Sequence, residues 1–243
     1  MDLSLLGYIY LGLAAFLVGF TKTSVGGVGI LAVLMVALAI PGKASPGVLL
    51  PMLIAADIMA VIYYRRSCQW HILLKLLPPT VIGVIIGYLT IGIIPTEVFV
   101  RVIGSVILLM LFLEFFVLGK GRLQAGGYWF TNFIGIFAGI ATMIANAAGP
   151  VFGIYLLQMG LNKQEFVGTR SWFFLIVNLF KLPFSAGLGL ITFDTLTLNL
   201  TVLPVILMGA FLGYKVLGYI NLALFKWLIR GAVLLAATRL ILF

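Results

Sequence analysis

The sequence predicts an all-α integral membrane protein with two inverted-topology repeats, whose broken or re-entrant helix hairpins meet near the membrane midplane. Hydrophobic residues make up 63% of the 243 residues, charged residues make up 9%, and the mean hydropathy is +1.27. Most uncharged runs reach about 20 residues, enough for a helix to cross a hydrocarbon core of roughly 30 Å. A polar break interrupts the apolar sequence in each half. Because lipid offers no partner for freed backbone amides, such breaks are expected inside the protein.

Composition also excludes several classes of protein. The apolar runs lack the alternation of apolar and polar residues that a membrane β-barrel requires. The net charge of +9 lies mostly at segment ends, where basic residues set topology and contact lipid headgroups, so it does not indicate nucleic acid as a partner. The single cysteine, Cys68, excludes an internal disulfide and argues against a cysteine-based metal site. We therefore expect no cofactor and no metal.

The first half of the chain contains five apolar segments followed by a hydrophilic linker. The segment before the break covers 3–20, and the segment after it covers 26–40, which at about 15 residues is short for a span. The other segments cover 44–64, 72–92 and 97–118. We expect residues 1–118 to form the first repeat and residues 119–126 to form a cytoplasmic linker.

The second half repeats this plan, and we expect residues 127–243 to form the second repeat. A shift of 120 residues, which becomes 126 in the later part, aligns Gly19 with Gly139, Gly29 with Gly149, Lys43 with Lys163 and Gly83 with Gly209. The corresponding segments cover 128–143, 147–160, 164–187, 197–216 and 219–242. Weak internal symmetry of this kind is typical of transporter folds.

The distribution of basic residues predicts the orientation. The loop that begins at Arg65 and the linker at 119–126 carry basic clusters, which places both in the cytoplasm. Lys43 then lies outside, whereas its repeat equivalent Lys163 lies inside. Equivalent residues on opposite sides imply inverted repeats with both termini outside, in a multi-pass protein of the cell inner (plasma) membrane.

The first break supplies one set of substrate-binding candidates. A lysine at membrane depth is energetically expensive, and Lys22 stands where the break begins. Hydroxyl groups and free backbone N–H groups follow it, and the next helix has partial positive charge at its N-terminus. The candidates are Lys22, Thr23, Ser24, Gly26 and Gly27.

The second break supplies Asn146 and Ala147 from the equivalent position of the other half. Two inverted repeats bring their broken segments together near the midplane, with two short helices directed N-terminus first at one point. The shared site then has amide, hydroxyl and backbone donors and at least one fixed cation. Such a site favours a compact anion with several acceptor oxygens.

The helix expected at 164–187 adds four candidates at spacings of four, four and three, which places them on one face: Arg170, Phe174, Asn178 and Lys181. A face with three polar residues is not expected to contact lipid. Arg170 can bind an oxyanion in bidentate fashion, and Lys181 can act as a second positive charge. The aromatic run 172–174 can pack on an apolar or aromatic substituent.

Asp57 is the one acid of the first half that lies away from a segment end. It either carries a proton as a coupling group or forms a structural ion pair with Lys22. The cations also have structural interpretations, because Lys22 and Lys181 can extend toward the membrane surface and Arg170 can lie at the interface.

The amide and glycine candidates have structural interpretations too. Asn146 and Asn178 can form interhelical hydrogen bonds, and glycines three or four residues apart allow close helix packing. We interpret two such pairs as packing sites only: Gly83 with Gly87, and Gly209 with Gly213.

The combined motifs resemble the sulfite exporter TauE/SafE and 4-toluene sulfonate uptake permease family across essentially the whole chain. They are Gly19-x-x-Lys22 before a glycine-rich turn, Pro41-x-Lys43-Ala44, Asp57, Tyr64-Arg65-Arg66 with Trp70, Gly149-Pro150, and Phe166-Val167-Gly168-Thr169. The resemblance implies a transporter of small sulfur-containing anions such as sulfite, thiosulfate, sulfoacetate or an aryl sulfonate.

These features together predict a secondary transporter that exposes a midplane site alternately to the two sides, and not an enzyme. The alternative is an anion channel of the same architecture, which needs a continuous wetted path. The expected partners are the transported anion and the lipid bilayer, and a homo-oligomer is possible.

Overall fold

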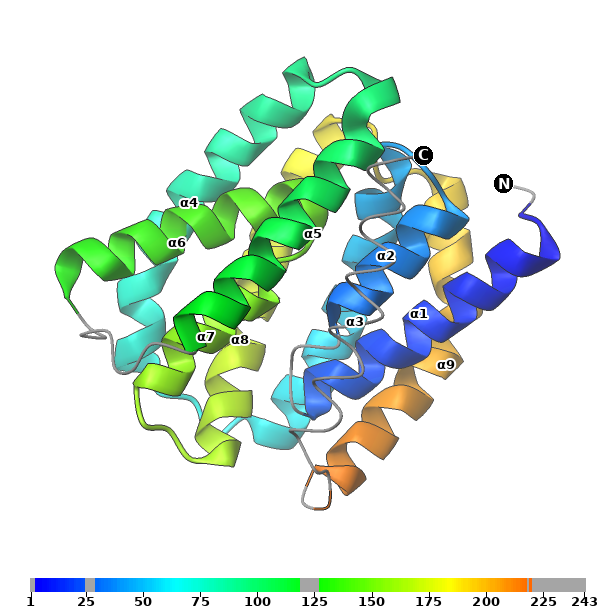
Figure 1. The fold of residues 1–243 in the computed structure, drawn as a ribbon. Coiled ribbons are helices and arrows are strands. Elements are labelled where there is room, and N and C mark those ends of the chain that lie inside the picture. Colours follow the sequence, from blue (N-terminus) through cyan, green and yellow to red (C-terminus); the bar gives the residue numbers. More distant parts are fainter. Residues whose placement is uncertain (1–2, 25–28, 119–126, 218, 220–243) are drawn as a thin grey trace.

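The computed structural model describes residues 3–24, 29–118, 127–217 and 219, and within these residues every regular element is a helix (Figure 1). The helices are α1 (Leu5–Thr23), α2 (Gly29–Ala39), α3 (Ala44–Tyr64), α4 (Trp70–Ile93), α5 (Thr96–Leu118), α6 (Tyr128–Ala145), α7 (Gly149–Gln158), α8 (Lys163–Gly187) and α9 (Phe193–Val216). The expected linker at 119–126 and the expected segment at 219–242 lie essentially outside the described residues.

Local capping explains where several helices begin. The Ser4 hydroxyl accepts a hydrogen bond from the backbone N–H of Gly7 at 3.1 Å at the start of α1. At the start of α8, Asn162 and Glu165 form a reciprocal capping box. Each device pairs N–H groups that a helix start otherwise leaves free.

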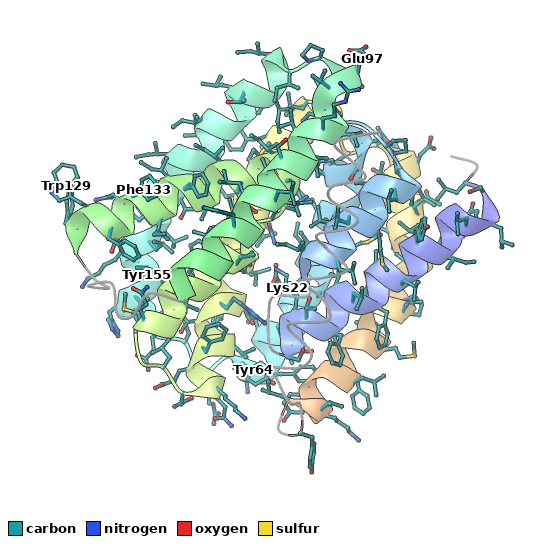
Figure 2. The ribbon with its side chains drawn as sticks, in the orientation of Figure 1. Lys22, Tyr64, Glu97, Trp129, Phe133 and Tyr155 are labelled. Atoms are coloured by element: carbon teal, nitrogen blue, oxygen red, sulfur yellow. The ribbon has the colours of Figure 1, made fainter. Side chains whose placement is uncertain are left out.

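Among the residues that the structure describes, five helices are long and apolar enough to cross a membrane: α1, α3, α4, α6 and α9. By contrast, α2 has 11 residues and α7 has 10. Large apolar side chains also face outward, as Figure 2 shows for Trp129 and Phe133, which are 83% and 64% exposed. An apolar outer surface suits lipid as the surrounding medium.

Glycines allow two pairs of helices to approach closely, α4 with α6 and α1 with α9 (Figure 1). A Cβ atom added at Gly83 would lie 2.1 Å from the Ile136 carbonyl oxygen, and one added at Gly209 would lie 2.2 Å from the Phe16 carbonyl oxygen. Gly87 and Gly213 continue the same two contacts. The packing interpretation of both glycine pairs is confirmed, and both pairs pack within the chain.

The helices α3 and α8 pack against each other in opposite directions. Near the end of α3, the Gln69 side-chain amide donates to Glu165 Oε1 at 2.7 Å, close to the start of α8. At the other end, Gly47 of α3 contacts Leu190, which follows α8. This antiparallel pair carries most of the polar candidates into the interior.

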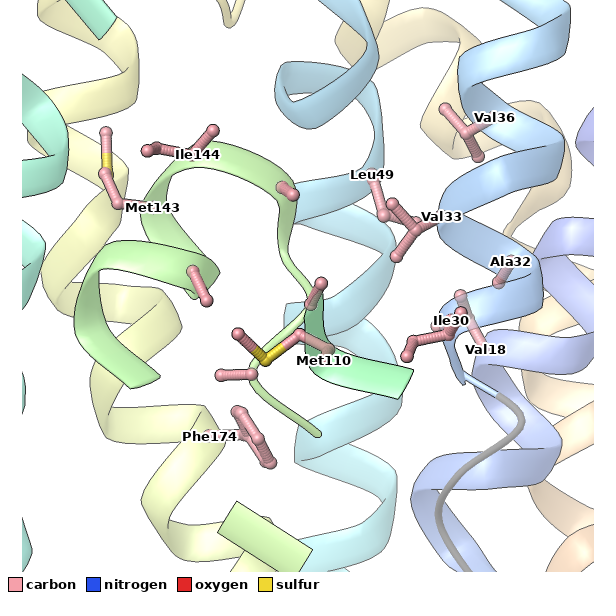
Figure 3. Packing of buried hydrophobic residues seen from close by; sticks show 14 of the residues in the cluster. Val18, Ile30, Ala32, Val33, Val36, Leu49, Met110, Met143, Ile144 and Phe174 are labelled. Atoms are coloured by element: carbon pink, nitrogen blue, oxygen red, sulfur yellow. The ribbon is translucent and has the colours of Figure 1, made fainter. Parts of the chain in front are cut away.

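A continuous apolar core surrounds this polar interior. Figure 3 shows Val18 of α1, Ile30 of α2, Leu49 of α3, Ile144 of α6 and Phe174 of α8 around the turn that joins α6 to α7. All five side chains are less than a tenth exposed. The core therefore holds the two chain breaks near one another.

Candidate functional site

Lys22 lies in the last turn of α1, so the helix continues past the point where the sequence predicts the break. Threonine hydroxyls make this continuation possible by bonding back to the helix. The Thr21 hydroxyl donates to the Val18 carbonyl at 3.2 Å, and the Thr23 hydroxyl oxygen lies 3.2 Å from the Gly19 carbonyl oxygen of the same helix. Polar side chains near the end of α1 thus find hydrogen-bond acceptors within the helix itself. A polar stretch in the sequence therefore does not mark the residue at which the helix ends.

Lys22 forms an ion pair with Asp57 of α3, with 2.7 Å between Nζ and Oδ1. The Lys22 side chain is 12% exposed, whereas that of Asp57 is fully buried. The other carboxylate oxygen of Asp57 accepts a hydrogen bond from the Asn178 amide of α8 at 2.8 Å. Lys22 Nζ also lies 4.3 Å from the centre of the Phe174 ring. Of the two expectations for Asp57, the structure contains the ion pair.

Arg170 binds the C-terminal end of α1. Its Nη2 atom donates to the carbonyl oxygens of Thr21, Lys22 and Ser24 at 2.7, 3.1 and 2.8 Å. These carbonyls stand at the C-terminal end of α1, where a helix carries partial negative charge, which a guanidinium complements. Within the described residues the buried Nε atom has no partner. The Nη2 arm of the fork is thus engaged by the protein, and bidentate binding of an anion by Arg170 stays a prediction.

Lys181 binds the equivalent end of α6. Its ammonium donates to the Thr142 carbonyl at 2.7 Å, to the Thr142 hydroxyl at 3.2 Å and to the Asn146 side-chain oxygen. Asn146 adopts a left-handed backbone conformation (φ 52°) that ends α6, and its amide donates to the Pro46 carbonyl at 3.1 Å. Lys181 is 1% exposed, so its predicted role as a second positive charge facing the anion is not what the structure shows.

These contacts join into one polar network that crosses between the two halves of the chain. Lys22 contacts Asp57, Asp57 contacts Asn178, and the Asn178 side-chain oxygen lies 3.4 Å from Lys181, which contacts Asn146. The network links α1, α3, α8 and the turn after α6. The network therefore connects the end of α1 with the end of α6 through side-chain contacts.

A cavity of about 60 Å³ lies between these elements, enough for several water molecules at about 10–15 Å³ each. Lys22, labelled in Figure 2, is one of the residues that line it. The short helices α2 and α7 both begin at its wall, with Gly29 and Gly149. The lining residues are Val18, Thr21, Lys22, Gly29, Ile30, Leu53, Thr142, Asn146, Ala147, Gly149, Pro150, Arg170, Phe174 and Asn178.

Six predicted ligands line this cavity: Lys22, Asn146, Ala147, Arg170, Phe174 and Asn178. Thr23 and Ser24 do not, and both are fully buried. The Thr23 hydroxyl donates to the Ala210 carbonyl at 2.7 Å, so it anchors α1 to α9. Gly26 and Gly27 lie outside the described residues.

The aromatic run on α8 contributes only one wall of the cavity. Phe174 lines it, but Phe173 stacks on Phe152 with 4.0 Å between ring centres, and Trp172 packs against Trp70. The expectation that all three rings contact a substituent is therefore wrong for Trp172 and Phe173. One helical face cannot present three consecutive residues to the same site.

Sequence reasoning missed two hydroxyl-bearing lining residues, Thr21 and Thr142. A signal for Thr142 was present, because the 120-residue shift aligns it with Lys22. Thr21 precedes Lys22 directly. Both residues stand where a helix breaks, so backbone and side-chain donors gather at the same place.

The cavity wall carries cations and neutral donors, whereas the one nearby acid lies behind it. Lys22, Arg170 and Asn178 line the cavity, and Asp57 does not. Among the described residues, no group of three or more His, Cys, Asp or Glu side chains is placed to hold a metal. The arrangement suits reversible binding of a small anion.

A family model, Sulfite exporter TauE/SafE, matches residues 11–240, which is nearly the whole chain. No curated protein and no solved structure matches the chain. The family match agrees with the apolar spans of the fold, and it identifies a multi-pass membrane protein of a transporter family. The chain therefore belongs to the sulfite exporter TauE/SafE family.

Proposed function

We propose that the protein is a secondary transporter that moves small sulfur-containing anions, such as sulfite, thiosulfate, sulfoacetate or an aryl sulfonate, by alternating access. The observation that carries the proposal is the interior cavity at the two chain breaks, where Lys22 reaches the wall and Asp57 stays behind it. A sulfur oxyanion presents several acceptor oxygens to the donors there. The Phe174 ring offers an apolar wall for a substituent on the sulfur.

Alternating access is supported by the way equivalent residues contact each other across the two halves. Gly83 of the first half packs on Gly139 of the second. The repeat shifts convert this pair into Gly209 and Gly19, and an added Cβ at Gly19 would meet the α9 backbone at Ile206 and Ala210. The contact between α4 and α6 therefore has a counterpart between α9 and α1, in which the corresponding glycines come from the opposite halves.

The ends of the central helices support inverted repeats. Lys43 precedes α3 and donates to the Ile91 carbonyl near the end of α4 at 3.0 Å. Its equivalent Lys163 begins α8, which lies at the other end of the antiparallel α3–α8 pair. In such proteins the two halves exchange conformations, so that the site opens to one side and then to the other.

For an anion that moves without a coupling ion, the membrane potential favours export as the working direction. Moving an anion into a cell against a negative-inside potential costs about 2.3 kcal/mol per charge per 100 mV, whereas export gains that energy. Uptake needs a cotransported cation or an exchanged anion.

A binding screen on purified protein tests the proposal. Thermal unfolding is measured with sulfite, thiosulfate, sulfoacetate, toluene sulfonate, sulfate and chloride. A ligand at 100 times its Kd stabilises a protein by about 2.7 kcal/mol. We expect a sulfur anion to give this stabilisation and chloride to give little, and equal effects of all six anions would contradict the proposal.

Variants connect binding to the cavity. Lys22→Gln is combined with Asp57→Asn so that no buried carboxylate loses its partner, and we expect the double variant to lose anion stabilisation. The exposed Lys75→Gln variant serves as the control and should retain it. In vesicles, flux that saturates at carrier rates supports a transporter, whereas a single-channel conductance would support the channel alternative.

A further inference from the structure

Asp57 lies directly behind two residues that face the cavity. Lys22 and Asn178 both line the cavity, and each contacts one oxygen of the Asp57 carboxylate, at 2.7 and 2.8 Å. Asp57 itself is fully buried and is not part of the cavity wall. An anion that enters the cavity therefore competes with Asp57 for the Lys22 ammonium.

We propose that Asp57 binds a proton when an anion occupies the cavity, so that the protein moves one proton together with each anion. This inference rests on the proposed transport function and adds its coupling ion. In the empty site, the Lys22 ammonium pairs with the Asp57 carboxylate. On binding, one anion takes the ammonium as its partner, and one hydronium ion from the aqueous solution transfers its proton to Asp57 Oδ1, which gives the neutral acid and leaves a water molecule. Charge and protons balance, and release reverses both steps.

The physical reason is the cost of an unpaired buried carboxylate. Removing one partner of a buried ion pair leaves a charge with neither water nor a counter-ion. Asp57 has no exposed surface through which water can replace Lys22. Protonation removes that charge, and the neutral acid keeps Oδ2 as an acceptor for the Asn178 amide.

The other charged groups near Asp57 are bound to other parts of the protein, so the charge of Asp57 depends mainly on its ion pair with Lys22. From α8, Arg170 is bound to carbonyls at the end of α1, and Lys181 is bound to Thr142 and Asn146. The helix α2 contains no titratable residue. The titratable residues of α9 stand at its two ends, and on α3 itself Tyr64 donates to the Thr23 carbonyl. Within the described residues, Lys22 is the cation in direct contact with Asp57.

Proton counting on wild-type protein tests the inference without any substitution. The probes are thiosulfate, sulfoacetate and toluene sulfonate, which keep their own charge near neutral pH. The probe that binds best is added to protein in weakly buffered solution with a pH indicator. We expect uptake of close to one proton per bound anion, and affinity that rises roughly tenfold for each pH unit of acidification. Binding without proton uptake would overturn the inference.

The variant Asp57→Asn assigns the proton to its residue. An amide of nearly the same shape cannot ionise, so we expect tight anion binding that no longer depends on pH and is not accompanied by proton uptake. The exposed Asp194→Asn variant is the control and should behave like wild type. Persistent proton uptake in folded Asp57→Asn would overturn the assignment. If none of the three probes binds wild-type protein, the proposed transport function fails as well, which separates that result from failure of the coupling step alone.

Discussion

Replacing Arg170 by alanine is expected to destabilise the fold by about 3 to 6 kcal/mol. The three carbonyl contacts of Nη2 measure 2.7, 3.1 and 2.8 Å, but one nitrogen carries only two hydrogens, so they amount to about two hydrogen bonds. A hydrogen bond that involves a charged group contributes about 1.5–3 kcal/mol. Because water from the cavity can reach part of the vacated space, we expect the lower end of this range.

Thermal unfolding of purified protein in detergent measures this loss. For a protein of this size, 1 kcal/mol corresponds to about 2–4 °C in Tm, so a loss of about 3 kcal/mol predicts a decrease of about 6–12 °C. Arg170→Lys keeps the positive charge but loses the planar guanidinium, so its Tm should lie between those of the wild type and Arg170→Ala. Arg65→Ala is the control, because Arg65 is exposed and offers only its backbone carbonyl, to Trp172.

One result would refute this reasoning. If Arg170→Ala unfolds at the wild-type temperature and yet loses anion stabilisation, the guanidinium does not hold the end of α1. Arg170 would then be a free ligand for the anion, as the sequence alone suggested.

Three further predictions test the packing, a thiol and a backbone turn. Gly83→Ala should lower Tm strongly, since its Cβ would lie 2.1 Å from a carbonyl oxygen, whereas Gly92→Ala on the same helix meets nothing within 4 Å and should be neutral or slightly stabilising. Partial burial raises the pKa of the Cys68 thiol to about 11, and a hydrogen bond with Thr169 opposes this shift to a smaller extent. Alkylation of Cys68 near pH 8 should therefore be roughly 100-fold slower than alkylation of a free thiol with a pKa of 9.0. Equal alkylation rates would contradict this half-buried placement of the thiol. Asn146→Gly should be more stable than Asn146→Ala by about 1 kcal/mol, because φ is 52° and alanine disfavours that region, and equal Tm values for the two variants would mean that the turn relaxes.

Sequence reasoning predicted the helices well because a membrane span is recognised from a run of about 20 mostly apolar residues. The expected segments 44–64 and 164–187 correspond to α3 (Ala44–Tyr64) and α8 (Lys163–Gly187). The first break was misplaced because polarity was taken to mean the end of a helix. The hydroxyls of Thr21 and Thr23 lie within hydrogen-bond distance of carbonyls of the preceding turn, and α1 continues to Thr23.

The sequence predicted which residues form the candidate site better than it predicted what each of them contacts. Lys22, Asn178 and Asn146 were placed at one site, and all three line the cavity. Lys181 was interpreted as a ligand for the anion, yet it binds Asn146. Spacing along a helix shows which residues share a face, but not which of them find partners in the protein before a ligand arrives.

The positions that the 120-residue shift aligns differ in charge between the two halves of the chain, and this difference bears on the proposed mechanism. Under the 120-residue shift Lys22 corresponds to Thr142, and Asp57 corresponds to Val177. The first half therefore brings an ion pair to the cavity, whereas the second brings an ammonium that is bound to the end of α6. If the halves exchange conformations as proposed, Asp57 limits the proposed proton binding to the first half, because Val177 at the corresponding position cannot ionise. The proposed coupling then depends on Lys22 leaving Asp57 for the anion.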